Sequence, residues 1–154
     1  MSIISSAHLE RQVTGKKVLI DTNIVIYLTD QVEPYEDLSK LLFTLIEEGK
    51  VNAILSVISI AEVMQGPLKK GLNDNALKIK EYLLNFPNMA CQIINGDVLE
   101  IIGLDNRIKW ANLRTIDSLI IASGLKNNVD KIISNDLHFK QAVATDLLVS
   151  FDAK

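Results

Sequence analysis

Apolar and polar positions along the chain follow two alternating patterns. Short runs of branched aliphatic residues predict buried β-strands, and they occupy residues 18–20, 51–59, 91–95, 131–134 and 147–151. Other segments repeat their apolar residues every three or four positions, which predicts helices at 24–28, 35–49, 60–67, 76–85, 97–113 (broken at Gly103), 115–128 and within 136–146. Turn-forming residues at 69–75 predict a mobile loop.

Helices that alternate with aliphatic strands indicate one architecture. Strands without a polar face belong to a parallel sheet that helices cover on both faces. We therefore expect an α/β protein with three layers, α/β/α, around a central parallel sheet of about five strands. The 154 residues fit one domain, so we expect a single domain over 1–154, with 1–16 as an amino-terminal extension.

Composition narrows the class of protein. Hydrophobic residues make up 48% of the chain, but no apolar segment approaches the length of about 20 residues that crosses a bilayer. We expect a cytoplasmic protein without membrane contact. Cys91 is the only cysteine, which excludes an internal disulfide. The net charge of −3 argues against a nucleic-acid partner unless bound cations reverse the field of an acidic pocket.

Three acidic residues follow predicted strands. Asp21 comes directly after the first strand, Glu62 just after the second, and Asp136 two residues after Ser134. The carboxyl ends of parallel strands share one edge of the sheet, so these side chains are expected to gather there. Each also has a structural interpretation: Asp21 and Asp136 are placed to cap helices, and Glu62 suits a solvated first helical turn.

Asp117 is the most informative of the acids. Its helical neighbours at three and four positions include Leu113, Ile120 and Ile121, so its carboxylate projects from an apolar stripe. A buried carboxylate needs a cation, an arginine or a raised pKa. Arg114, one turn earlier, is the alternative partner.

Together the four acids form a ligand set of oxygen atoms. Such a set suits Mg²⁺ or Mn²⁺, whereas zinc prefers histidine and cysteine. His8 lies in the amino-terminal extension and His138 in the short helix after the fourth strand. For both histidines a surface or capping role is the favoured interpretation.

At this point the chain resembles the PIN-domain family, especially toxin ribonucleases of VapC type from prokaryotic toxin–antitoxin pairs. Four motifs carry the resemblance over residues 17–151, and they read VLIDTNIVIYL, SVISIAEVMQG, RTIDSLIIASGLKNN and IISNDLHF. The resemblance implies that Asp21, Glu62, Asp117 and Asp136 bind the metal, with Asn23 and Ser134 as pocket supports. His138 departs from the pattern, because an acid often stands there in the family.

The resemblance implies metal-assisted hydrolysis of RNA phosphodiester bonds by a PIN-like fold. One or two cations would activate water, and no nucleophilic side chain is needed. The expected partners are RNA, a cognate antitoxin and a second copy of the chain, for which the apolar face of 37–46 is either an interface or core. Basic side chains near the motifs are weak candidates for RNA contact, namely Lys69, Lys70, Arg107, Lys109 and Arg114.

Two other functions compete with the nuclease. One is a non-catalytic PIN-like RNA-binding or scaffold module, in which the acids only cap helices. The other is a phosphoryl-accepting receiver domain, which would need two adjacent acids after the first strand and a lysine after the last. Asp21 stands alone and no such lysine follows LLVSFDA, so the receiver domain is disfavoured.

Overall fold

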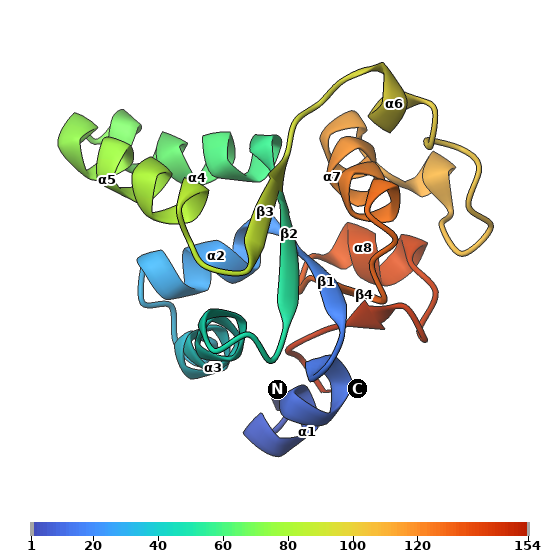
Figure 1. Cartoon of the computed structure of the whole chain (residues 1–154), viewed down its shortest axis with the longest axis horizontal. Coiled ribbons are helices and arrows are strands. Elements are labelled where there is room, and N and C mark those ends of the chain that lie inside the picture. Colours follow the sequence, from blue (N-terminus) through green and yellow to red (C-terminus); the bar gives the residue numbers. More distant parts are fainter. Residues whose placement is uncertain (1, 154) are drawn as a thin grey trace.

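The computed structural model describes residues 2–153, and its helices and strands alternate along the chain (Figure 1). The elements in order are α1 (Ser6–Val13), β1 (Lys17–Ile20), α2 (Thr22–Thr29), α3 (Glu36–Glu47), β2 (Asn52–Ser56), α4 (Val57–Lys69), α5 (Asn73–Leu84), β3 (Met89–Gln92), α6 (Gly96–Leu99), η1 (Trp110–Asn112), α7 (Thr115–Lys126), β4 (Lys131–Ile133), α8 (Leu137–Ala142) and β5 (Leu148–Val149).

The five strands form one parallel sheet in the order β3-β2-β1-β4-β5. Strand β1 lies in the middle, with Leu19 opposite Ile54 of β2 and Ile132 of β4. The chain builds outwards from β1 to β3 on one side and then returns to build β4 and β5 on the other. The carboxyl ends of β1, β2 and β4 therefore meet at the switch point, where ligands bind in sheets of this kind.

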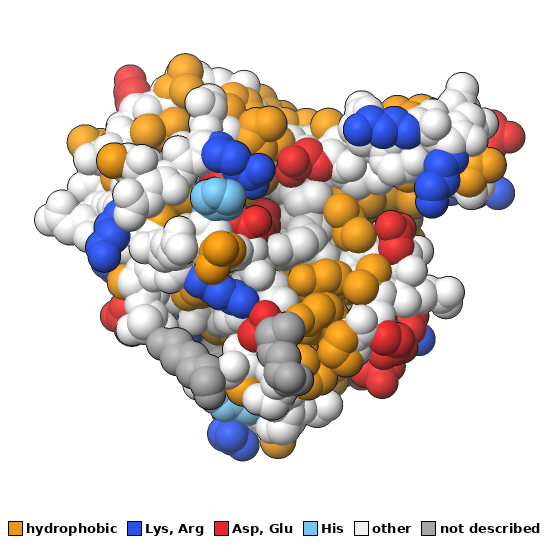
Figure 2. All heavy atoms as spheres, turned by 180° about the vertical axis from the view of Figure 1, so that it is seen from behind, with side chains coloured by type: hydrophobic (Ala, Val, Ile, Leu, Met, Phe, Trp, Pro, Cys, Tyr) orange, Lys and Arg blue, Asp and Glu red, His pale blue; other side chains and the backbone are white. Residues whose placement is uncertain are grey.

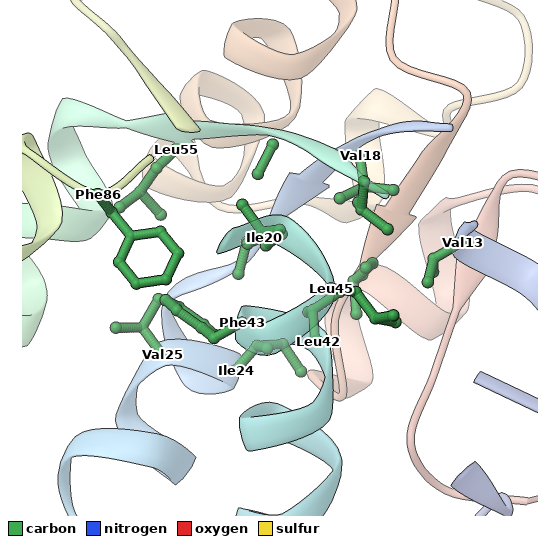
Figure 3. Close-up of a cluster of buried hydrophobic side chains, with 14 of the residues drawn as sticks. Val13, Val18, Ile20, Ile24, Val25, Leu42, Phe43, Leu45, Leu55 and Phe86 are labelled. Carbon is green, nitrogen blue, oxygen red and sulfur yellow. The ribbon is translucent and has the colours of Figure 1, made fainter. Parts of the chain in front are cut away.

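Each face of the sheet supports its own hydrophobic core. Val18 and Ile20 of β1 face the core formed with α1, α2 and α3, whereas Leu19 between them faces the core formed with α7 and α8. Figure 3 shows Val18 and Ile20 among side chains of α2 and α3. The two helical layers lie on opposite sides of the strands in Figure 1. The prediction of a three-layer α/β/α fold with a five-stranded parallel sheet is confirmed.

Helix α7 packs very closely on β1. A Cβ atom built on Gly124 would lie 2.8 Å from the Cβ atom of Leu19, which is closer than real Cβ contacts come. Gly124 therefore fixes the distance between α7, which carries Asp117, and β1, which precedes Asp21.

Several predicted boundaries differ from the structure. The second strand ends at Ser56, because the Ser56 hydroxyl accepts a hydrogen bond from Ile58 N–H and caps a helix there. That helix, α4, also continues through Pro67 to Lys69. The expected loop at 69–75 shrinks to residues 70–72, and α4 and α5 form the pair of helices that projects from the body in Figure 1.

The helix predicted over 97–113 is wrong, and the structure adds detail to two other segments. The segment 97–113 contains only one helical turn, α6, followed by turns and η1. The extension 1–16 forms α1, whose Leu9 and Val13 are buried. The apolar face of 37–46 belongs to the core rather than to an interface, because Leu42 is fully buried and Leu38 is 3% exposed.

Among residues 2–153, every helix is too short or too polar to span a lipid bilayer.

Candidate metal centre

Asp21 lies at the carboxyl end of the central strand and is 4% exposed. Its Oδ1 atom accepts a hydrogen bond of 2.8 Å from Thr22 N–H and so caps α2. Its Oδ2 atom accepts one of 2.6 Å from the hydroxyl of Ser134, at the end of β4. The cap therefore accounts for one carboxylate oxygen, while the second faces the neighbouring strand.

Ser134 joins Asp21 to Asp136. While its hydroxyl donates to Asp21, it accepts a hydrogen bond of 3.1 Å from Asp136 N–H. Asp136 in turn caps α8, since its Oδ2 atom accepts from His138 N–H at 2.8 Å and from Phe139 N–H at 3.3 Å. Both capping interpretations are thus correct, but they use only part of each carboxylate.

Glu62 approaches the same group from α4. Its Oε1 atom accepts a hydrogen bond of 2.6 Å from the Thr22 hydroxyl, which also lies 2.9 Å from the Ser59 hydroxyl. Thr22 follows Asp21 directly, so this contact ties α4 to the end of β1. Glu62 also lines a hollow of about 180 Å³ with Arg114, Thr115 and Ile116.

Asp117, on the first turn of α7, is 3% exposed. Arg114 holds both of its oxygens, with Nε 2.8 Å from Oδ2 and Nη2 3.0 Å from Oδ1. The arginine expected as an alternative partner is therefore present. Its side chain is 63% exposed, so the ion pair is open to solvent on the arginine side only.

The electrostatics show that the acids share one region. The pKa of Asp21 is raised from 3.8 to about 7. Burial is the largest cause, and the charges of Asp136 and Asp117 contribute to the same rise. The hydrogen bonds from Ser134 and Thr22 act in the opposite direction. Arg114 has a raised pKa, first because of its hydrogen bonds to Asp117, and the charges of Asp136 and Glu62 add to this effect.

A tighter group within this region includes a histidine. Asp117, Asp136 and His138 each offer a ligand atom, and the three atoms lie within 4.8 Å of one another. The Nδ1 atom of His138 is 3.3 Å from Oδ2 of Asp136. On the face of the molecule shown in Figure 2, acidic side chains lie next to a histidine and basic side chains. Sequence reasoning assigned His138 to the surface and missed this position, although its replacement of a family acid was a signal.

The residues present fit a divalent cation. The donors are hard carboxylate oxygens, the ligand type that Mg²⁺ and Mn²⁺ prefer. The charges of Asp117 and Asp136 act on Asp21, and a cation relieves such repulsion between carboxylates. The Oδ1 atom of Asn23 is also buried and accepts no hydrogen bond within residues 2–153, and buried polar atoms without a partner are uncommon.

The predicted RNA-contacting residues are dispersed. Lys69 and Lys70 are exposed at the end of α4, and Lys109 is exposed beside η1. Arg107 forms a two-pronged ion pair with Asp105, at distances of 2.8 and 3.1 Å. Of the five basic residues, Arg114 alone is shown in direct contact with one of the four acids.

Comparisons with known proteins agree with this architecture. The PIN domain family model matches residues 18–144, whereas no curated protein sequence matches the chain. Among solved structures, VapBC2 from Rickettsia felis bound to a promoter DNA fragment is similar with a TM-score of 0.60 and 18% identity, over 88% of this chain and 99% of that one. A toxin–antitoxin complex from Klebsiella pneumoniae is similar with a TM-score of 0.59 and 21% identity, over 86% and 95%.

A third similar structure is VapC20 from Mycobacterium tuberculosis, a toxin that cleaves the sarcin–ricin loop. Its TM-score is 0.59 at 14% identity, over 80% of this chain and 93% of that one. At such identities these likenesses show the fold, while the family model covers most of the chain and includes Asp21, Glu62, Asp117 and Asp136. The strand order, the converging acids and this match together show that the chain belongs to the PIN-domain family.

Proposed function

We propose that this protein is a divalent-metal-dependent endoribonuclease that hydrolyses RNA phosphodiester bonds, and that it acts as the toxin of a type II toxin–antitoxin pair. One observation carries the proposal: Asp117 and Asp136, which lie far from Asp21 in the sequence, are close enough for their charges to raise the pKa of Asp21. Arg114 balances the charge of Asp117, whereas Asp21 and Asp136 accept hydrogen bonds from neutral hydroxyl and backbone N–H groups.

We assign four acids to the ion, as ligands that bind it directly or through water: Asp21, Glu62, Asp117 and Asp136. When bound, Mg²⁺ or Mn²⁺ supplies an activated water molecule and charge stabilisation at the scissile phosphate. The protein contributes a fixed frame: Ser134 orients Asp21 and the backbone of Asp136, and Thr22 orients Glu62. We also assign to the support of this pocket Asn23, whose buried Oδ1 atom accepts no hydrogen bond within residues 2–153.

We assign two roles to Arg114. It neutralises Asp117 while no cation is bound, and its exposed side chain can turn towards the backbone of an RNA substrate once a cation takes the carboxylate. Arginine suits that contact because its guanidinium matches phosphate geometry. Lys69, Lys70, Arg107 and Lys109 are assigned weaker roles on the surrounding surface.

The proposed partners follow from the solved relatives. Similar structures include complexes described as VapBC or toxin–antitoxin, so we propose a cognate antitoxin for this chain. Homodimerisation and a cytoplasmic location remain predictions.

The decisive experiment measures cleavage of single-stranded RNA in Mg²⁺ or Mn²⁺ by the wild type and Asp117→Asn. The variant removes a ligand charge and should lose cleavage while retaining its circular dichroism spectrum. Glu100→Gln, at an exposed carboxylate outside the acidic group, should cleave like the wild type. Equal cleavage by Asp117→Asn and the wild type would contradict the proposal.

One observation favours the competing non-catalytic module: Arg114 already satisfies Asp117. In such a module the ion pair would be structural and no cation would bind. Wild-type protein that binds RNA but neither binds a divalent cation nor cleaves would establish that alternative.

A further inference from the structure

We propose that His138 is a ligand of the bound cation and shifts the selectivity of the site from Mg²⁺ towards transition-metal ions. This inference rests on the proposed function, because it concerns the same centre. The proposed site differs from a site made of carboxylates alone in one ligand atom, which is a nitrogen instead of an oxygen.

The position of His138 is built by α8. Asp136 caps this helix through His138 N–H, which places the histidine in the first turn, two residues after the capping acid. Its Nδ1 atom lies 3.3 Å from Asp136 Oδ2, which is longer than a usual hydrogen bond and leaves both atoms able to bind one ion. The side chain is 44% exposed, so it is free to adjust.

The distances to the third member also fit. Ligand atoms of Asp117, Asp136 and His138 lie within 4.8 Å of one another. Two atoms held to one ion by bonds of about 2.0–2.2 Å are at most about 4.4 Å apart. Side-chain adjustments of a few tenths of an ångström therefore suffice.

The chemistry of imidazole sets the consequence. Mg²⁺ prefers oxygen ligands and gains little from a neutral nitrogen, whereas affinity for nitrogen donors rises along the first transition series from Mn²⁺ to Co²⁺ and beyond. A site with two or more carboxylates and one histidine therefore binds Co²⁺ and Mn²⁺ more tightly, relative to Mg²⁺, than a site made of carboxylates alone.

A competing role for His138 is to orient Asp136 without touching the ion. The two roles make different predictions. A positioning residue affects every cation equally, because each one depends on Asp136 in the same way. A nitrogen ligand affects Co²⁺ much more than Mg²⁺.

The experiment titrates the full chain with Mg²⁺ and with Co²⁺ by calorimetry, and records the visible absorption of the Co²⁺ complex. The proteins are wild type, His138→Ala, His138→Asp and His8→Ala. His8 is the matched control, because it lies on α1 beside a separate groove lined by Arg11 and Leu148.

For the wild type we expect Co²⁺ to bind at least roughly tenfold more tightly than Mg²⁺. His138→Ala should lose roughly tenfold or more in Co²⁺ affinity and change the Co²⁺ spectrum, while its Mg²⁺ affinity stays within about threefold. His138→Asp should tighten Mg²⁺ binding and reduce the ratio of Co²⁺ affinity to Mg²⁺ affinity. His8→Ala should match the wild type.

Equal losses for both cations in His138→Ala, or an unchanged Co²⁺ spectrum, would overturn the ligand assignment and leave the proposed nuclease intact. Wild-type protein that binds neither cation would overturn the metal-dependent function and this inference together. The circular dichroism spectrum of each variant is compared with that of the wild type, to show that a loss of cation affinity is not caused by unfolding.

Discussion

Replacement of Asp21 by asparagine should stabilise the cation-free protein at neutral and alkaline pH. In the wild type, burial raises the pKa of Asp21 from 3.8 to about 7, so ionisation of this group opposes folding. This rise in pKa corresponds to a loss of about 4 kcal/mol in the free energy of unfolding above pH 7. Asparagine carries no charge and still caps α2 through its oxygen, but the Ser134 hydroxyl loses its carboxylate acceptor, which costs about 1 kcal/mol.

The sign of the effect depends on pH. Below about pH 4 Asp21 is protonated in both the folded and the unfolded chain, so the stabilisation that comes from its neutral form is fully present there. As the pH rises the unfolded chain ionises first, and the stability contributed by the neutral group is lost, completely so above about pH 7. We therefore expect Asp21→Asn to gain about 3 kcal/mol at pH 8 and to lose about 1 kcal/mol at pH 4.

Thermal melting in the presence of a chelator measures this difference. At about 2–4 °C per kcal/mol for a chain of this length, the melting temperature of Asp21→Asn should rise by roughly 6–12 °C at pH 8. Glu100→Gln, at an exposed carboxylate, should show no such rise. Addition of Mn²⁺ should stabilise the wild type and not Asp21→Asn. A variant no more stable than wild type at pH 8, or a gain independent of pH, would refute the reasoning.

Two further predictions concern α7. Arg114→Gln removes the side chain that competes with the cation for Asp117, so calorimetry should show tighter Mn²⁺ binding. The free energy of unfolding of the cation-free protein should fall by about 1–2 kcal/mol, because only the carboxylate side of this ion pair is buried. An unchanged Mn²⁺ affinity would show that the ion does not bind Asp117. Gly124→Ala should lower the free energy of unfolding by about 1–3 kcal/mol because its Cβ meets Leu19, whereas Gly66→Ala, with open space around it, should be neutral or stabilising by up to about 1 kcal/mol. Urea denaturation compares these two variants, and equal stabilities would contradict the packing argument.

The layered fold was predictable because each face of a central strand needs a covering helix. The aliphatic run at 18–20 has no polar face, and in the structure Val18 and Ile20 face one core while Leu19 faces the other. The segment 97–113 was not predictable in the same way. Its apolar residues resemble a helical pattern, but Leu104 is 72% exposed and Ile108 pairs with Val143 in an isolated bridge.

The candidate site was predictable only in its acidic part. Asp117 stood out because a carboxylate on an apolar stripe requires a partner, and the structure supplies Arg114 from one turn away. The proximity of His138 to Asp117 depends on how α7 and α8 approach each other, which no local pattern encodes. The full length of α4 was also missed, because Gly66 and Pro67 are typical of a helix end, although α4 continues to Lys69.

The central claim is that distant carboxylates converge to hold a divalent cation, and anomalous diffraction from crystals soaked in Mn²⁺ tests it most directly. We expect a manganese peak bounded by Asp21, Asp117 and Asp136, with the Arg114 guanidinium displaced from Asp117. A map without a peak at this place, with Arg114 still paired to Asp117 at saturating Mn²⁺, would contradict it.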